Sequence, residues 1–130
     1  METNELTPQI DFNAPKLAEL VEKLTLDQID SLPFGVVRLD DQGAVSIYNK
    51  TEGRLSGFGD RPVLGRRFFV DIAPCTNNAY FKGLIDKARR AGTLNIAFTF
   101  VGDFCDRDRE LSVRAQSANE GGTWIFTNRP

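Results

Sequence analysis

The sequence predicts an α+β domain in which a five-stranded antiparallel sheet carries helices on one face and a helical cap at its N-terminus. Two observations lead to this class. Five short β-prone segments are separated by turn residues, which favours antiparallel neighbours, and the other periodic segments repeat apolar residues at helical spacing. The 130 residues, 41% hydrophobic and 26% charged, suit one globular domain with a single core.

Residues 1–31 are expected to form the cap, and residues 32–130 the core of the same domain. Four apolar residues recur at i, i+3, i+4 and i+7, which is one helix face: Leu17, Leu20, Val21 and Leu24. The segment Thr25–Gln28 has the pattern of a capping box that opens a second short helix ending before Pro33. A single apolar stripe should therefore dock the cap on the core.

The core begins with a β-hairpin over residues 34–49, turning at residues 41–43. Glycines and a proline divide residues 50–65 into short helices and turns, where the backbone can approach a ligand closely. A longer helix fits residues 78–90, whose apolar residues share one face. Three strands follow, over residues 94–104, 109–116 and 122–128. This order of elements is typical of a PAS-type sensor domain.

The composition argues against several partners. A net charge of −2 disfavours a nucleic-acid module, because such domains supply cations to phosphates. No apolar stretch approaches the ~20 residues that span a bilayer, and the polar N-terminus is unlike a signal peptide, so we expect a cytoplasmic domain without a membrane partner. The two cysteines, Cys75 and Cys105, and the absence of histidine predict no metal site and no disulfide in a reducing compartment.

Cys75 is the most informative residue of the chain. It follows two phenylalanines and stands directly after a proline. Because histidine, the usual base beside a nucleophilic thiol, is absent, the pattern favours an attachment point or a buried structural cysteine over a catalytic nucleophile. The residue types alone leave these two interpretations open.

Two motifs together resemble the photoactive yellow protein family. The first ends the second strand and enters the short helices: Tyr48-Asn49-Lys50-Thr51-Glu52-Gly53. The second contains the cysteine: Phe68-Phe69-Val70-Asp71-Ile72-Ala73-Pro74-Cys75-Thr76. Their spacing from each other and from Leu32-Pro33-Phe34-Gly35, together with Trp124 in the last strand, is also similar to that family. The likeness runs from about Leu24 to Arg129.

The resemblance implies a non-enzymatic PAS-fold receptor that carries p-coumaric acid (4-hydroxycinnamic acid) as a thioester on Cys75 and senses blue light by trans-to-cis isomerisation. It implies that Tyr48 and Glu52 hydrogen-bond the phenolate oxygen and that Ser56 supports the tyrosine. Further residues are expected at the chromophore: Phe58, Phe68, Ala73, Pro74, Thr76 and Phe100. Phe58 stands where the family carries an arginine over the pocket.

The chemistry of these residues agrees with that role. A buried phenolate needs hydrogen-bond donors, and Tyr48 and Glu52, four residues apart, would project from one side of a helical turn. Glu52 must be protonated to donate, and burial beside an anion favours that form. Light would move its proton to the phenolate, and the buried carboxylate left behind would loosen the cap, residues 1–31.

Two other functions remain open at this stage. The first is a PAS-type sensor of a small ligand or of thiol redox state in which Cys75 carries no chromophore. The second is a cysteine enzyme acting on thioesters, which the missing histidine disfavours. A monomer with an unidentified downstream signalling protein is the simplest assembly. The loop at residues 102–106 departs from the family, and Cys105 within it has no matching role.

Overall fold

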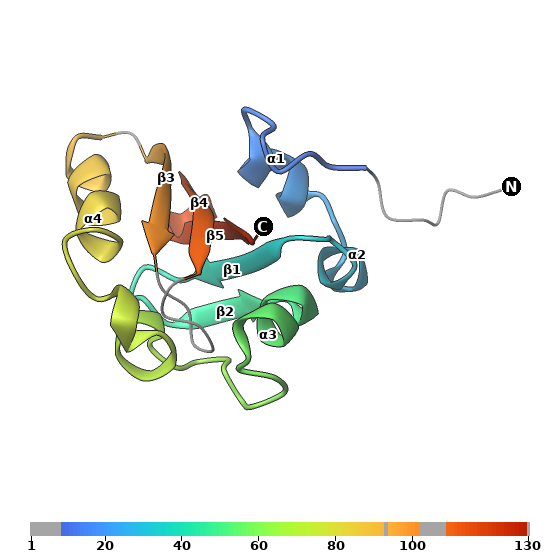
Figure 1. Cartoon of the computed structure of the whole chain (residues 1–130). Helices are drawn as coiled ribbons and strands as arrows, with labels where there is room; N and C mark the ends of the chain where they lie inside the picture. Colours follow the sequence, from blue (N-terminus) through green and yellow to red (C-terminus); the bar gives the residue numbers. More distant parts are fainter. Residues whose placement is uncertain (1–8, 93, 102–108, 130) are drawn as a thin grey trace, which may run out of the picture.

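A computed structural model of the chain describes residues 9–92, 94–101 and 109–129. Its centre is a five-stranded antiparallel sheet in the order β2-β1-β5-β4-β3 (Figure 1). The strands are β1 (Gly35–Leu39), β2 (Val45–Tyr48), β3 (Asn95–Val101), β4 (Glu110–Ser117) and β5 (Thr123–Asn128). The sheet predicted from the sequence is confirmed, and the last strand lies at its middle.

Two groups of helices cover the two faces of this sheet. The cap consists of α1 (Leu17–Glu22) and α2 (Leu26–Asp30). The other face carries α3 (Lys50–Ser56), the π-helical turn η1 (Phe68–Ile72), the 3-10 turn η2 (Pro74–Thr76) and α4 (Lys82–Arg90). A short 3-10 turn, η3 (Asn119–Gly121), joins β4 to β5. Figure 1 shows the cap and α4 on opposite sides of the sheet.

Alternation along β5 divides the core into two clusters. Trp124 and Phe126 pack beneath the cap against Leu17 and Val21, whereas Ile125 between them belongs to the cluster on the other face. Successive side chains of a strand point to opposite faces, so a single strand contacts both groups of helices. The two halves of the core therefore meet only through the sheet.

Local signals in the sequence account for most element boundaries. The capping box is confirmed: the Thr25 hydroxyl accepts from the Gln28 N–H at 3.2 Å, and the Gln28 side chain accepts from the Thr25 N–H at 2.9 Å. The helix expected from residue 78 begins at Lys82, because the Asn78 side chain holds the preceding residues in a turn. Residues 102–104, expected in the third strand, lie outside the described residues.

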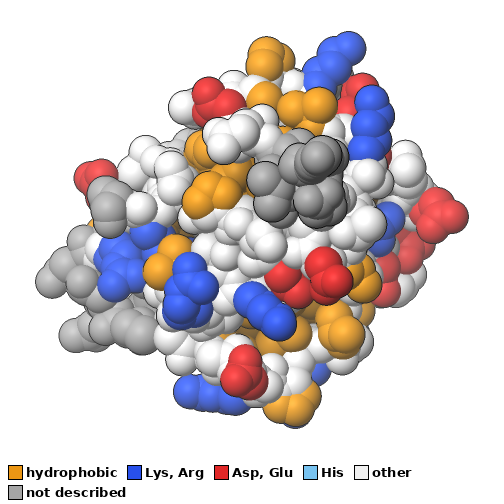
Figure 2. All heavy atoms as spheres, turned by 90° about the vertical axis from the view of Figure 1, so that its right-hand side faces the viewer, with side chains coloured by type: hydrophobic (Ala, Val, Ile, Leu, Met, Phe, Trp, Pro, Cys, Tyr) orange, Lys and Arg blue, Asp and Glu red, His pale blue; other side chains and the backbone are white. Residues whose placement is uncertain are grey.

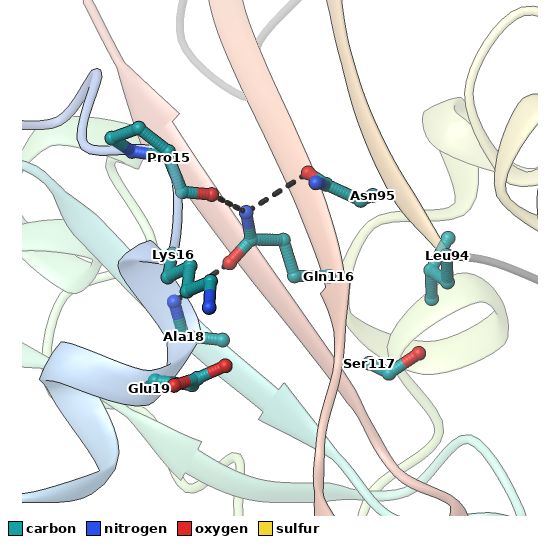
Figure 3. Close-up of a pocket in the computed structure, with 8 residues that line it drawn as sticks. All are labelled: Pro15, Lys16, Ala18, Glu19, Leu94, Asn95, Gln116 and Ser117. Carbon is teal, nitrogen blue, oxygen red and sulfur yellow. Dashed lines mark hydrogen bonds between the residues drawn. The ribbon is translucent and has the colours of Figure 1, made fainter.

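Polar side chains of β4 also hold the cap. Arg114, only 9% exposed, donates from Nη1 to the carbonyl oxygens of Phe12 and Ala14 at 2.7 and 2.6 Å. The Gln116 side-chain oxygen accepts from the Ala18 N–H at 2.7 Å, and Figure 3 shows this amide lying between the N-terminal segment and β3. The apolar stripe expected from the sequence is confirmed for Leu17, Val21 and Leu24, whereas Leu20 is 39% exposed and lies outside the core cluster beneath the cap. The stripe acts together with a polar clamp that leucine spacing could not reveal.

The face at the right-hand side of Figure 1 is shown in Figure 2. Acidic and basic side chains are interspersed over it, with hydrophobic side chains in small groups, so the described residues form no continuous basic surface there. No helix within the described ranges combines the length and apolar character needed to cross a bilayer. Among the same residues, no three His, Cys, Asp or Glu side chains gather as metal ligands.

Candidate functional site

The site is organised by Asn49, which caps α3 directly after β2 and is 1% exposed. Its side-chain oxygen accepts from the backbone N–H groups of Glu52 (2.9 Å) and Val36 (3.0 Å). Its nitrogen donates to the carbonyl oxygens of Ile29 (2.9 Å) and Phe34 (3.1 Å). Because this buried amide is satisfied on every side, it fixes α3 against β1 and the cap, and so fixes the position of Glu52.

Tyr48 and Glu52 come from different elements. Tyr48 ends β2, and Glu52 lies in the first turn of α3. The expectation that both project from one helical turn is therefore not what the structure shows, because the chain changes from strand to helix at Asn49. Both side chains nevertheless line the same cavity.

Glu52 is a buried residue, 6% exposed, and its side chain has strong donors on both oxygens. The Arg129 guanidinium donates from Nη1 to Oε1 at 2.9 Å and from Nη2 to Oε2 at 3.1 Å. The Thr127 hydroxyl donates to Oε1 at 2.5 Å. Since the Arg129 side chain is only 4% exposed, this is a two-pronged ion pair removed from water, which is the strong form of such a contact.

Gly35 provides the space for this cluster. It faces Thr127 across the β1–β5 pair. A Cβ atom at Gly35 would overlap both Oε1 of Glu52 and Oγ1 of Thr127. Glycine is needed here because of close approach and not because of a left-handed backbone, since its φ is not positive.

A second group of contacts surrounds Tyr48. Its hydroxyl lies 3.3 Å from Oγ of Ser56, and this serine oxygen also accepts from the Phe58 N–H at 3.2 Å. The Phe58 ring is 6.1 Å from the tyrosine ring, and the Arg61 guanidinium lies over the phenylalanine at 5.0 Å. Ser56 thus contacts the tyrosine it was expected to support, and a cation stacks on Phe58.

Cys75 lies in η2 and is exposed. This exposure argues against the buried structural cysteine that the sequence left open. The Thr76 hydroxyl donates to the Ala73 carbonyl oxygen at 2.6 Å, and the Asn78 side chain donates to the Cys75 carbonyl oxygen at 2.9 Å. These bonds hold the backbone on both sides of the thiol.

One cavity brings the thiol, the tyrosine and the carboxylate together. Its lining consists of Tyr48, Glu52, Phe68, Ala73, Cys75, Thr76, Phe81, Leu111, Thr127 and Arg129. The apolar members suit an aromatic ring, and the polar members suit an oxygen anion and a covalent attachment. The cavity measures about 30 Å³, whereas about 150 Å³ holds a benzene ring. An aromatic group would fit the chemistry of this lining but would have to widen the space.

Six residues predicted for the chromophore site line this cavity: Tyr48, Glu52, Phe68, Ala73, Cys75 and Thr76. The other four lie outside its lining. Ser56 and Phe58 lie beside the tyrosine, Phe100 is buried in the adjoining core, and Pro74 is exposed at the start of η2. The loop at 102–106, with Cys105, lies outside the described residues.

Sequence reasoning missed four lining residues: Phe81, Leu111, Thr127 and Arg129. The last two could have been found. The sequence predicts a strand over residues 122–128, in which Trp124 and Phe126 share the face beneath the cap. A period of two then places Thr127 on the opposite face, and Arg129 follows at the same spacing. Which groups those residues meet depends on the order of strands, and periodicity does not give that order.

Comparisons with known proteins agree with the fold of this chain. The family model described as the PAS fold matches residues 26–127. The chain is 39% identical over 103 residues to the photoactive yellow protein of Rhodothalassium salexigens, covering 78% of this chain and 82% of that protein. It is 35% identical over 101 residues to the photoactive yellow protein of Rhodobacter capsulatus, covering 77% and 82%.

A solved structure gives the same result. The photoactive yellow protein domain of the sensor histidine kinase Ppr from Rhodospirillum centenum superposes with a TM-score of 0.73 at 34% sequence identity. The superposition covers 85% of this chain and 97% of that domain. The shared fold therefore takes in most of this chain.

Proposed function

Since the chain belongs to the photoactive yellow protein family of PAS-fold domains, we propose that it is a blue-light photoreceptor carrying p-coumaric acid as a thioester on Cys75. One observation carries the proposal. An exposed thiol shares a single cavity with two groups able to hold a phenolate oxygen, Tyr48 and Glu52. The aromatic residues of the same lining suit the ring between them.

Cys75 is the attachment point in this proposal. Its thiolate attacks the carbonyl carbon of an activated ester of p-coumaric acid, a C–S bond forms, and the activating group leaves with the electron pair of the broken bond. Exposure of Cys75 gives the ester access to the sulfur. The bonds that fix Ala73 and the Cys75 carbonyl keep this backbone in place during the reaction.

Tyr48 and Glu52 hold the phenolate end. The Tyr48 hydroxyl, supported by Ser56, donates one hydrogen bond, and a protonated Glu52 donates another. The bound chromophore supplies light absorption and trans-to-cis isomerisation. Glu52 then gives its proton to the departing phenolate oxygen and becomes a buried carboxylate, which has to be compensated by a cation or hydrogen-bond donors inside the pocket.

The cap is the proposed output element. It packs on the sheet face away from the cavity, with a core cluster of its own. We expect light to undock residues 1–31, which amide exchange in the dark and in the light can test. Equal protection of the Leu20 and Leu24 amides in both states would contradict this step.

The chain is proposed to act on a protein partner as a monomeric sensor without enzymatic activity of its own. Support comes from the related domain in a sensor histidine kinase, where the same fold is part of a signalling protein. No metal and no nucleic acid enter the mechanism, which uses only the thiol, the hydroxyl and the carboxyl group.

Incubation of the purified chain with an activated ester of p-coumaric acid tests the attachment. Intact-mass measurement should show one added coumaroyl group, and Cys75→Ser should show none. Coumaroylation with no visible band would favour a ligand or redox sensor, and release of free acid with turnover would indicate a thioesterase. Either result would overturn the photoreceptor.

A further inference from the structure

The contacts of Glu52 in the structure differ from those that the proposed function needs. A guanidinium that donates to both oxygens requires both to be acceptors, and Thr127 adds a third donor at Oε1. A protonated carboxyl group would present its own hydrogen to one of these donors. The geometry is therefore that of a carboxylate, not of the hydrogen-bond donor that a phenolate needs.

Neither charge of this ion pair can stay buried without a charge of opposite sign beside it. The two side chains are 7% and 4% exposed. Removing one member of a buried pair leaves an uncompensated charge, whereas exchanging it for another of the same sign does not. Glu52 can therefore become neutral only if a second anion comes to face Arg129. Since Arg129 lines the same cavity as Tyr48 and Cys75, a phenolate in that cavity is such an anion.

We propose that Arg129 is the resident counter-ion of the chromophore pocket. Glu52 gives up its ion pair with Arg129 when it takes up a proton, and forms the pair again when it loses that proton. This inference rests on the proposed function. During loading, the Glu52 carboxylate takes the proton of the incoming phenol and releases Arg129, which then faces the phenolate. In the light the proton returns from Glu52 to the phenolate oxygen, and Arg129 binds the carboxylate again. The pocket holds one cation and one anion throughout, so every step conserves charge.

Two features of the fold prepare Arg129 for this role. It directly follows β5, the central strand of the sheet, which is fixed by pairing with β1 and β4. Gly35 leaves the space in which Glu52 and Thr127 meet, so the carboxylate can return to the same donors. At the first residue of α3, Asp30 accepts from the Lys50 N–H at 2.9 Å, and in the last turn of the same helix Arg109 donates to the Leu55 carbonyl oxygen at 3.0 Å.

The first test uses the chain without chromophore. Denaturant unfolding of wild type, Glu52→Gln, Arg129→Gln and the double variant forms a double-mutant cycle. We expect the two positions to be coupled by at least about tenfold in the folding equilibrium constant, or about 1.4 kcal/mol. The control variant Arg54→Gln removes an exposed charge from the same helix as Glu52, and its cycle with Arg129→Gln should show no coupling in the folding equilibrium constant. Coupling below about twofold would overturn the proposal.

The second test uses the loaded protein and infrared difference spectroscopy. Light should remove the C=O stretching band of a protonated carboxyl group, and Glu52→Gln identifies that band. In Arg129→Gln, Glu52 should keep its proton, so that the equilibrium in the light shifts about tenfold or more toward the protonated form. Arg129→Lys retains the positive charge and should restore the light-induced loss of the C=O band. If Arg129→Gln does not fold, Arg129→Met, which keeps much of the aliphatic stem and removes the charge, takes its place in both tests.

These outcomes separate the two claims. An undiminished band loss in Arg129→Gln, within a coloured and photoactive protein, would overturn the exchange and leave the photoreceptor standing. Failure to form any coloured adduct would overturn the photoreceptor and the exchange with it, while the coupling in the chromophore-free chain would still measure the ion pair.

Discussion

The polar clamp between β4 and the cap predicts that one residue of the sheet controls how firmly the N-terminus is docked. Arg114 makes two short bonds to backbone carbonyl oxygens in the segment before α1. Replacing it with methionine keeps much of the aliphatic stem and removes the charge and the donors. We therefore expect Arg114→Met to weaken docking of the cap without unfolding the sheet.

The structure sets the size of this effect. Each hydrogen bond from a charged donor is worth about 1.5–3 kcal/mol, so the two bonds together contribute roughly 3–6 kcal/mol if no new hydrogen bond replaces them. The carbonyl oxygens of Phe12 and Ala14 regain water when the segment opens, so about 3 kcal/mol is expected from the lower end of that range. At about 1.4 kcal/mol for each factor of ten, opening becomes on the order of 100-fold more frequent.

Amide hydrogen exchange measures this opening residue by residue. In the dark, the amides of Leu20 and Leu24, which are bonded to Lys16 and Val21, should exchange on the order of 100-fold faster in Arg114→Met. The Ile125 amide in β5 should not change, because it opens only with the sheet. Equal exchange of the cap amides in both proteins would refute the clamp, and faster exchange of Ile125 would show that the effect is global.

Three further changes test other parts of the site. Gly35→Ala forces a methyl group against Glu52 and Thr127, and denaturant unfolding should show a loss of about 1–3 kcal/mol; an unchanged midpoint would contradict the close approach. Tyr48→Phe removes a donor worth about 1.5–3 kcal/mol to a phenolate, so in the loaded protein the phenolate band should protonate about 1–2 pH units higher; a titration with an unmoved midpoint would remove the tyrosine from the site. Thr25→Ala opens the capping box of α2 and should cost about 1 kcal/mol, seen as faster amide exchange in that helix; unaltered exchange would mean that packing alone holds it.

Much of the fold could be predicted because it is encoded locally. The capping box at Thr25, the hairpins and the apolar faces of the helices all depend on residues within about four positions of one another. Asn49 shows where such reasoning stopped short, since it was counted as a strand residue. The spacing from Asn49 to Glu52 is a helix-cap signal that could have placed the start of α3.

The contacts that the sequence could not provide are those between distant segments. Glu52 and Arg129 are 77 positions apart and meet because β5 pairs with β1. Periodicity does not predict that pairing. Arg114 and Gln116 lie in a strand that is buried on both faces, so alternation of polar and apolar residues could not show that both side chains face inward beneath the N-terminal segment.

The most direct measurement is the visible absorption of the loaded protein before, during and after blue light. Wild type should show a band that bleaches under illumination and returns in the dark, and Cys75→Ser treated in the same way should show no band. A band that does not bleach, or one that persists in Cys75→Ser, would contradict a photoreceptor built on a Cys75 thioester.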